Sequence, residues 1–529
     1  MIILLRVIKM LKIKAKCSQF ILFLSLFQMN CIMFTVSDLD PDGLLSQLLL
    51  LSRLQNSSLA TEPILTRSLY GYANGTKAFF QWHKVPDATS YKLYYSTSET
   101  VSLSDSSSPE TTEPWILLDG LDTSTLYYFQ LYATLSDGNQ VTHKHSYPAF
   151  TNPVPFGTSS SASALNISAS QGIDSGLYGV LNINPYLNKI HVSTQNGNTP
   201  GGKIPSLFNC NSDGTNCSFQ NVSTGIASVG DQVTPHSIID FQSEKIFISS
   251  TNQGSSSEPA LFLCPIDGGN CTYQDISVGQ GSNSGFEPFL IINPLNGELL
   301  TLTRNASVGL NLFRCDNLGT VCQSIDLSGS NQYMPATNER AGAVINPDNN
   351  KLYTVIPSFP TNGAPRLYIS NLDGTNVSSI DISSGSGSGS GTAPTVLIDY
   401  INSKLIVITN GFNARVGFFR CDLDGSNSTY TPLGTNGQGT YPSATLDLIN
   451  QKVLIYAGDN TAPSNLLLFR CALDGTGCNT PSLNLSSIVS LTGIGVRTTT
   501  RIDPKSGRVL VSSQRSTGTP TGLPYLIIH

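Results

Sequence analysis

Apolar and polar residues alternate along most of the chain, in short runs separated by Gly, Pro, Asn, Asp and Ser. Alternation with a period of two is typical of strands that bury one face. The turn residues between these runs favour tight antiparallel connections over helical crossovers. The pattern therefore predicts an all-β protein built from many short strands.

Between residues 160 and 529 the strands belong to a repeat of roughly 50 residues. In each unit a charged or polar residue opens an apolar strand, and an Asn or Asp lies five residues before it. The residues that open these strands are Lys189, Lys245, Glu298, Lys351, Lys404, Lys452 and Arg508. The earlier residues are Asn184, Asp240, Asn293, Asn346, Asp399, Asp447 and Asp503. Because such a residue recurs in every unit, we expect it to form a turn and not a catalytic carboxylate cluster.

A third strand in each unit runs into a Gly turn, as in LFNCNSDGTNC (residues 207–217), and a fourth strand follows it. Asp-Gly between apolar strands predicts a hairpin with a two-residue loop. Four short antiparallel strands per unit are typical of a propeller blade. The seventh unit stops after its third strand, at residues 525–529, while the segment from Ser163 to Ile167 resembles an orphan fourth strand. We therefore predict a seven-bladed β-propeller over residues 160–529, closed by pairing of its two ends.

The strand Lys351-Leu-Tyr353 together with Leu-Asp-Gly-Thr-Asn (372–376) resembles the YWTD and TolB-like propeller repeats. The Trp-Thr-Asp that names the first class is absent from this sequence. The resemblance therefore implies the propeller fold and no particular function.

Residues 64–151 also alternate, and they place Trp82 on one predicted strand and Tyr91 at the start of the next. Leu121, Thr125 and Tyr127 follow with the spacing of a tyrosine corner. This segment resembles a fibronectin type III domain, which implies an immunoglobulin-like sandwich that acts as a spacer or a protein-binding unit.

His143 and His145 share one face of a late strand in the same segment. Two histidines without a third ligand nearby indicate an exposed strand face in preference to a metal site.

The N-terminus predicts export. Basic residues precede the short apolar run from Phe20 to Met29, which has the length of a signal-peptide core (1–30). Cys31 follows directly, and the arrangement resembles a bacterial lipobox, which implies a lipidated tether over residues 31–63. Gln28 and Asn30 depart from the usual lipobox residues, so a simple signal peptide cut nearby remains the alternative.

The spacing of the cysteines also predicts export, because disulfides form outside the reducing cytosol. Pairs seven residues apart flank the predicted hairpin turns, where two sulfur atoms on opposing strand positions come within bonding range. The four predicted disulfides join Cys210 with Cys217, Cys264 with Cys271, Cys315 with Cys322, and Cys471 with Cys478. In the fourth unit Ser370 and Val377 replace both partners. Cys421 faces Ser428, which leaves either a buried or modified free thiol or an intermolecular bond.

Composition narrows the function. Charged residues are 12% of the 529-residue chain and the formal net charge is −6, which gives no basic patch for nucleic acid. No nucleophile–base motif is recognisable, so we name no catalytic residue, and we expect no metal and no cofactor. Asp422, Asp424 and Asn427 resemble half a calcium loop but coincide with the repeated hairpin turn.

The loops predicted to join the blades are long and unlike one another, which is typical of a binding face on a rigid scaffold. The candidate ligand-face residues in them are Tyr333, Arg340, Phe359, Phe412 and Arg415. We expect a non-enzymatic lipoprotein of the bacterial cell envelope, on the surface or periplasmic side of the outer membrane, that binds a protein or glycan. The alternatives are a propeller glycan hydrolase or lyase and a periplasmic scaffold.

Overall fold

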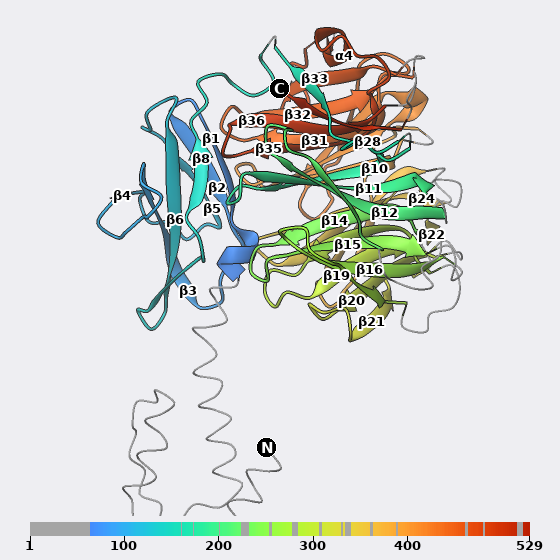
Figure 1. Cartoon of the computed structure of the whole chain (residues 1–529). Helices are drawn as coiled ribbons and strands as arrows, with labels where there is room; N and C mark the ends of the chain where they lie inside the picture. Colours follow the sequence, from blue (N-terminus) through green and yellow to red (C-terminus); the bar gives the residue numbers. More distant parts are fainter. Residues whose placement is uncertain are drawn as a thin grey trace, which may run out of the picture. The chain divides into compact units, whose positions relative to one another are not determined.

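The structure is a computed structural model, and it describes residues 64–529 apart from short internal gaps (Figure 1). Contacts divide the chain into Met1–Ser57 and Ser58–His529, and the described residues all belong to the second unit. The predicted signal peptide, Cys31 and the tether lie outside the described residues. The gaps are residues 160, 173, 200–201, 224–231, 253–256, 278–283, 306–308, 330–331, 334–339, 360–362, 388–389, 461–463, 480–481 and 516–521. Side chains are also not described at 198–199, 202, 232–233, 332–333 and 358–359.

After a helical turn at residues 64–68, two small antiparallel sheets form the first part of this unit. One has the order β1-β2-β5, with β1 (Tyr70–Asn74), β2 (Lys77–Gln81) and β5 (Trp115–Leu118). The other has the order β4-β3-β6-β7, with β8 also on β6. Its strands are β3 (Ala88–Ser96), β4 (Ser106–Ser107), β6 (Leu126–Leu135), β7 (Gln140–Thr142) and β8 (Tyr147–Phe150).

Aromatic side chains fill the space between these two sheets. The rings of Phe80 and Phe129 lie 4.5 Å apart, and Trp82 packs 5.2 Å from Tyr91. Trp82 is fully buried, although β2 ends one residue before it and not after it as expected. The two sheets therefore enclose one core, and we call residues 64–151 the sandwich.

Seven further sheets, counted over the described residues, follow one another along the chain, and each is an antiparallel meander of four main strands. The first three sheets are β10 (Leu177–Asn184), β11 (Lys189–Thr199), β12 (Gly202–Asn211), β13 (Ser218–Asn221); β14 (Gln232–Asp240), β15 (Lys245–Asn252), β16 (Glu258–Pro265), β17 (Thr272–Asp275); and β18 (Phe286–Ile292), β19 (Leu299–Arg304), β20 (Leu310–Cys315), β21 (Cys322–Asp326). The fourth has β22 (Gln332–Tyr333) and β23 (Gly342–Ile345) on β24 (Lys351–Phe359), then β25 (Ala364–Asn371) and β26 (Ser378–Asp381).

The fifth sheet consists of β27 (Thr392–Asp399), β28 (Lys404–Asn410), β29 (Val416–Asp422) and β30 (Thr429–Leu433), with a 3-10 turn at Phe412–Ala414. The sixth consists of β31 (Thr440–Asp447), β32 (Lys452–Gly458), β33 (Leu466–Ala472) and β34 (Leu483–Asn484), followed by α4 (Leu485–Ile488). The seventh has the order β35-β36-β37-β9, with β35 (Val496–Asp503), β36 (Arg508–Gln514), β37 (Pro524–Ile528) and β9 (Ser163–Asn166).

The seventh sheet joins segments from the two ends of the repeat region. Tyr525 pairs with Asn166 and Ile528 with Ser163, and the N–H of Ile167 donates to the carbonyl of Pro524. The pairing of β37 with β9 is the one predicted between the end of the last repeat and the segment that begins at Ser163.

The first strands of successive sheets contact one another in the order β10, β14, β18, β23, β27, β31 and β35, and β35 contacts β10. The sheets thus stand side by side around a central channel, with their first strands innermost. An all-β arrangement of meander sheets around a channel is a β-propeller.

Buried aromatic residues explain how neighbouring sheets pack. The third strand of most units carries a fully buried aromatic side chain two residues before the cysteine position: Phe208, Phe262, Phe313, Tyr368, Phe419 and Phe469. Three of these rings also meet an aromatic ring of the fourth strand at 4.9 to 5.4 Å. Because each such ring buries some 150–250 Å² of surface, the repeat supplies its own core.

The recurring Asn or Asp forms the turn between the first two strands, as predicted. Its side-chain oxygen accepts a backbone N–H two or three residues further on. The acceptors, each with its donor, are Asn184 with Leu187, Asp240 with Gln242, Asn293 with Leu295, Asn346 with Asp348, Asp399 with Asn402, Asp447 with Asn450, and Asp503 with Lys505.

All four predicted disulfides are present, with Cα atoms 4.0 to 4.2 Å apart. They are Cys210–Cys217, Cys264–Cys271, Cys315–Cys322 and Cys471–Cys478.

The predicted placement of both cysteines on opposing strands is correct for one pair and wrong for three. Cys315 pairs with Cys322 in the ladder between β20 and β21. The second cysteines of the other pairs, Cys217, Cys271 and Cys478, lie before the fourth strand of their sheets begins. For example, β17 begins at Thr272, one residue after Cys271. In the first two sheets the covalent bond therefore lies one residue before the ladder starts, whereas in the sixth sheet β34 begins only at Leu483, well after Cys478.

The predicted two-residue loop is wrong: the N–H of Asp316 donates to Val321 and that of Ala472 to Thr476, so those loops are longer, and the first hairpin shows the same. The N–H of Gly214 donates to Asn211, and the N–H of Asn211 donates to Thr215, which makes a three-residue loop with Gly214 in the left-handed region. Asn216 is then an extra residue, and it restores the register so that Cys210 still faces Cys217.

Disulfides in this number place the folded protein in an extracellular or periplasmic compartment. Cys421 is a free and buried thiol. In the described part of the chain, no helix has the length and apolar character needed to cross a bilayer.

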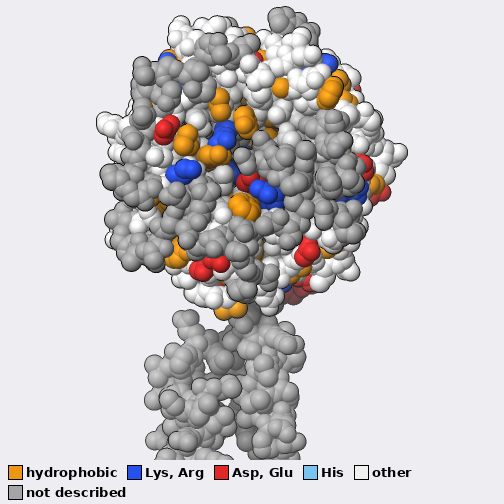
Figure 2. Space-filling view, turned by 90° about the vertical axis from the view of Figure 1, so that its right-hand side faces the viewer, with side chains coloured by type: hydrophobic (Ala, Val, Ile, Leu, Met, Phe, Trp, Pro, Cys, Tyr) orange, Lys and Arg blue, Asp and Glu red, His pale blue; other side chains and the backbone are white. Residues whose placement is uncertain are grey.

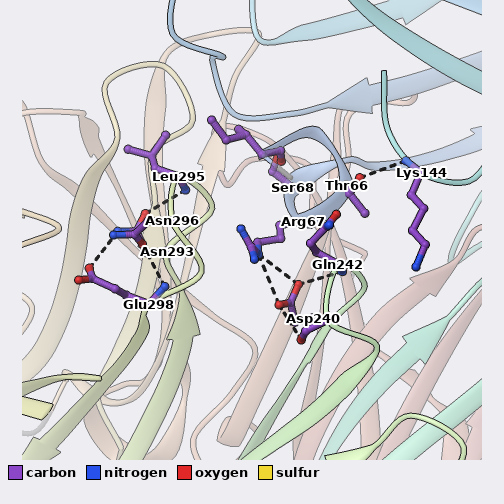
Figure 3. A network of polar contacts seen from close by, with 12 residues as sticks. Thr66, Arg67, Ser68, Lys144, Asp240, Gln242, Asn293, Leu295, Asn296 and Glu298 are labelled. Atoms are coloured by element: carbon purple, nitrogen blue, oxygen red, sulfur yellow. Dashed lines mark hydrogen bonds and ion pairs between the residues drawn. The ribbon is translucent and has the colours of Figure 1, made fainter. Parts of the chain in front are cut away.

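The sandwich lies against the rim of the propeller that carries the turns between first and second strands. Arg67 forms an ion pair with Asp240, and both side chains are buried (Figure 3). The hydroxyl of Tyr72 donates to the carbonyl of Leu446 and accepts the N–H of Leu448. The loops on the other rim, which join one sheet to the next, are therefore left free of the sandwich (Figure 1).

Candidate functional site

One backbone irregularity recurs in the innermost strands. Their pairing with the second strands shifts by one residue near the start, which marks a β-bulge, and a residue inside the bulge adopts a left-handed conformation. These residues are Tyr178, Thr234, Glu287, Ala393, Tyr441 and Arg497, with φ between 47° and 57°. In the fourth sheet the paired part of β23 begins at Gly342, so Arg340 holds the equivalent chain position. We call these seven residues the bulge ring.

The left-handed region costs a non-glycine residue about 1 kcal/mol or more, yet none of the bulge-ring residues is Gly. The backbone geometry is repeated, whereas the side chains are aromatic, basic, acidic or small. A fold requirement alone would favour the same small residue at every position. Strained bulges that present different chemistry instead indicate a functional site.

The bulge ring surrounds the channel mouth on the rim opposite the sandwich. A cavity of about 240 Å³ there is lined by Tyr178, Thr234, Arg340, Ala393, Tyr441 and Arg497, among others. Figure 2 shows this face, with basic side chains gathered among hydrophobic ones near its centre.

The guanidinium of Arg497 lies over two aromatic rings. Its guanidinium carbon lies 3.4 Å from the ring centre of Tyr178 and 5.4 Å from that of Tyr441. Cation–π contacts of this kind fix the plane of a guanidinium group while leaving its N–H donors available.

Glu287 and Arg304 form a buried ion pair beside the mouth, with Nε 3.3 Å from Oε2 and side chains 7% and 11% exposed. Burial raises the pKa of Glu287, and the positive charges of Arg304, Arg340 and Arg497 partly oppose that rise. The carboxylate therefore already has a cationic partner in the protein.

His236 lines the channel below the ring, and its Nδ1 accepts the N–H of Leu290. Burial lowers its pKa well below the usual value, and the nearby charges of Arg340 and Arg501 lower it further. A neutral imidazole in this bonded position supports the channel wall and supplies no positive charge.

At its other end the channel meets the sandwich. A second cavity of about 250 Å³ is lined by Gln81, Trp82 and His83 of the sandwich together with channel residues such as Arg501. The sandwich therefore covers one end of the channel, and the bulge ring surrounds the other.

The structure separates the five predicted ligand-face residues. Arg340 lies in the bulge ring, where its guanidinium donates to the carbonyl of Pro235. Tyr333 and Phe359 lie on the paired strands β22 and β24, but their side chains are not described. Phe412 is exposed in the 3-10 turn, and Arg415 lines a different cavity with Phe469.

Sequence reasoning missed the rest of the bulge ring. One signal was available: four bulge residues precede a proline that lies ten residues before the opening residue of the second strand. These dipeptides are Thr234-Pro235, Glu287-Pro288, Ala393-Pro394 and Tyr441-Pro442. Pro disfavours the right-handed helical region for the residue before it and cannot donate to a sheet ladder, so the dipeptide is consistent with an irregular strand.

The polar clusters considered for metals are structural where they are described. The expected exposed strand face is wrong for His143, which lies just after β7, is buried, and accepts the N–H of Leu131 through Nε2. Asp422 contacts the ammonium group of Lys404 and accepts from Asn427, which is the bonding of a turn. Among the described residues, no group of three or more His, Cys, Asp or Glu side chains could hold a metal ion.

Comparison with known proteins identifies no family. No protein-family model matches the sequence, and no curated protein matches it.

Similar folds occur among solved structures. A point mutant of NanB sialidase from Streptococcus pneumoniae is 9% identical, with 88% of this chain and 92% of that chain covered and a TM-score of 0.40. TolB from Acinetobacter baumannii is 13% identical over 67% of this chain and 75% of that chain, with a TM-score of 0.32. The β-propeller domain of the Trilobed protease from Pyrococcus furiosus is 9% identical over 67% and 94%, with a TM-score of 0.36.

Proposed function

We propose that this protein is an exported binding protein of the cell envelope and that its ligand binds at the channel mouth, inside the bulge ring. The observation that carries the proposal is the contrast between one repeated, strained backbone position and its different side chains in every sheet. Strain of about 1 kcal/mol at each of six residues is retained where function needs the side chains to be aimed.

The orientation of the sandwich supports this location. Its contacts with Asp240, Leu446 and Leu448 occupy the rim of uniform turns. The channel mouth and the variable loops therefore face away from the sandwich. A spacer attached to the opposite rim leaves a binding face accessible.

We propose that the propeller has seven blades, one for each four-stranded sheet, and that pairing of β9 with β37 closes it. We further propose that the sandwich is of the fibronectin type III class. The hydroxyl of Tyr127 accepts the N–H of Asp122, five residues upstream, which is the bonding of a tyrosine corner. The contact between Trp82 and Tyr91 in the core also supports this class.

The anchor is proposed from the sequence alone: Cys31 carries a lipid after removal of residues 1–30. Two or three acyl chains attach a protein stably to a bilayer. Cells given a palmitate analogue should label the full chain, and the Cys31→Ala variant should be unlabelled. Labelling that persists in that variant contradicts the anchor.

The binding proposal is tested by applying the full mature chain to arrays of glycans and matrix proteins. Ala393→Tyr narrows the mouth, and the ring already holds Tyr178 and Tyr441 at equivalent positions, also with positive φ. We expect a ligand that binds the native protein and is lost in this variant. The control is Leu318→Tyr, an exposed residue of a hairpin turn outside the ring. Binding that is unchanged in Ala393→Tyr, or no ligand on the array, overturns the proposed site.

One observation favours the enzymatic alternative, a glycan hydrolase or lyase. Glu287 is a buried carboxyl beside the mouth with a raised pKa, which is the property of a general acid. Hydrolysis would also need a second carboxyl group about 5–9 Å away. Release of labelled sugar from an end-labelled glycan, abolished by Glu287→Gln, would establish this alternative over simple binding.

A further inference from the structure

We infer that Arg497 anchors the carboxylate of an acidic sugar at the channel mouth. The inference deepens the proposed function and rests on it. It names the chemical class of the ligand and the residue that selects the class.

The geometry of Arg497 is that of a prepared anion receptor. The guanidinium lies over the rings of Tyr178 and Tyr441, no described residue accepts a hydrogen bond from its N–H groups, and the charge of Glu287 acts on it only from a distance. A planar guanidinium with fixed orientation and available donors matches a carboxylate through two parallel hydrogen bonds. Little side-chain entropy remains to be lost when the ligand binds, because the two rings already restrict the side chain.

The charge around the mouth favours an anion. Glu287 pairs with Arg304, so Arg340, Arg497 and Arg501 leave this cluster with a net positive charge. Because attraction to a positive cluster grows with the charge of the ligand, charge alone favours any anion, and the lining of the cavity distinguishes a sugar carboxylate from phosphate.

The lining of the cavity suits hydroxyl groups. Ser443 and Thr498 line it together with Thr234, and all three are buried. The hydroxyl of Ser443 has no hydrogen-bond partner among the described residues. A buried hydroxyl without a partner is costly, and a sugar hydroxyl can supply the missing hydrogen bond.

The size of the cavity suits a sugar. A volume of about 240 Å³ is close to the range of small-molecule sites, which are concave, and a monosaccharide is a ligand of that class. A monosaccharide that ends in a carboxylate is therefore the occupant that agrees with the volume, the charge and the hydroxyl lining.

The experiment is isothermal titration of the full mature chain with sodium glucuronate, glucose and sodium phosphate. We expect glucuronate to bind at least tenfold more tightly than either glucose or phosphate. Arg497→Gln should weaken glucuronate binding at least tenfold. Arg497→Lys, which keeps the charge but loses the planar fork, should weaken it several-fold.

The matched control is Arg508→Gln, which removes an exposed arginine at the start of β36, on the turn between the first two strands of its sheet. This control should bind glucuronate as the native protein does, and circular dichroism should show that every variant is folded. Equal binding by native protein and Arg497→Gln overturns the inference, as does tighter binding of glucose or phosphate.

The two proposals fail in different ways. An array ligand that is lost in Ala393→Tyr but retained in Arg497→Gln refutes the carboxylate anchor and keeps the site. A ligand retained in both variants refutes the site itself.

Discussion

Arg67 lies with Nε 3.3 Å from Oδ1 of Asp240, and this pair joins the start of the sandwich to the second sheet of the propeller. The two side chains are 9% and 0% exposed. The carboxylate also accepts the N–H of Gln242 and the hydroxyl of Ser243, so both of its oxygen atoms are bonded (Figure 3). The same carboxylate thus forms a turn and holds the sandwich.

Asp240→Asn separates these two roles, because Asn forms the same turn at Asn184, Asn293 and Asn346. The variant leaves the guanidinium of Arg67 buried without a counter-charge. We expect the free energy of the first unfolding transition in urea to fall by about 3 kcal/mol.

The control for this prediction is Glu244→Gln, which breaks the exposed pair between Lys144 and Glu244. Exposed pairs contribute about 0–1 kcal/mol, so the control should unfold nearly as the native protein does. Equal effects from the two variants would show that the Arg67–Asp240 pair does not couple the sandwich to the propeller.

The buried carboxyl group of Asp447 should make the free energy of unfolding depend on pH. Burial raises its pKa to about 6, despite hydrogen bonds from Asn450 that lower it. In the unfolded chain the pKa is about 3.9, so the folded state binds the proton more tightly. Its contribution to stability is therefore complete below pH 4 and is lost as the pH rises through 6, a change of about 3 kcal/mol.

Asp447→Asn removes this titration. Unfolding in urea at pH 4, 5.5 and 7 should show the variant gaining stability relative to the native protein as the pH rises. Asp424→Asn should instead lose stability relative to the native protein as the pH rises, because hydrogen bonds from Ser426 lower the pKa of the exposed Asp424. A difference between native protein and Asp447→Asn that is constant with pH would contradict the raised pKa.

The elements that sequence reasoning predicted depend on local chemistry. The strands follow from alternation, the turns from an Asn or Asp oxygen near its own backbone, and the disulfides from cysteines on both sides of one hairpin. The strand at Ser163 was also predictable, because the last unit lacked a fourth strand and an unpaired segment stood at the other end.

The site was not predictable in the same way. Its residues lie in different sheets, from Tyr178 to Arg497, and only the contacts between the inner strands of these sheets bring them together. Their left-handed conformation is also hidden, because Thr, Tyr and Arg are not residues that signal a positive φ. Of the predicted ligand-face residues, Arg340 alone lines the mouth cavity among described side chains.

Two expectations concern the free thiol of Cys421: it should react slowly with thiol reagents, and a cysteine placed opposite it should form a fifth disulfide. Cys421 is 1% exposed and burial raises its pKa to about 12, so it should resist a polar maleimide until the protein is unfolded. Arg420 pairs with Thr429, which places Ser428 opposite Cys421.

Ser428→Cys should therefore form a disulfide with Cys421, by analogy with the pair Cys471–Cys478 at the same position. Mass spectrometry should show the loss of two hydrogen atoms, and the unfolding free energy should rise by about 2 kcal/mol. Rapid labelling of native Cys421, or failure of the new pair to form under oxidising conditions, would contradict the buried, opposed geometry.

Ala393→Gly tests whether the bulge ring stores strain. Ala393 has φ 48°, where a methyl group is penalised and Gly is not. Gly also makes the unfolded chain more flexible, which offsets part of the gain, so we expect the variant to be more stable by about 0.5–1 kcal/mol in urea unfolding.

Ala343→Gly is the matched control, because Ala343 lies in β23 and is not one of the positive-φ residues. This variant should lose about 1 kcal/mol of unfolding free energy. Both variants lose one methyl group. If the unfolding free energy rises in one variant and falls in the other, the missing methyl group alone cannot be the cause. Loss of stability in both variants would mean that the left-handed bulge costs the native protein nothing, and the strain argument for the site would fall with it.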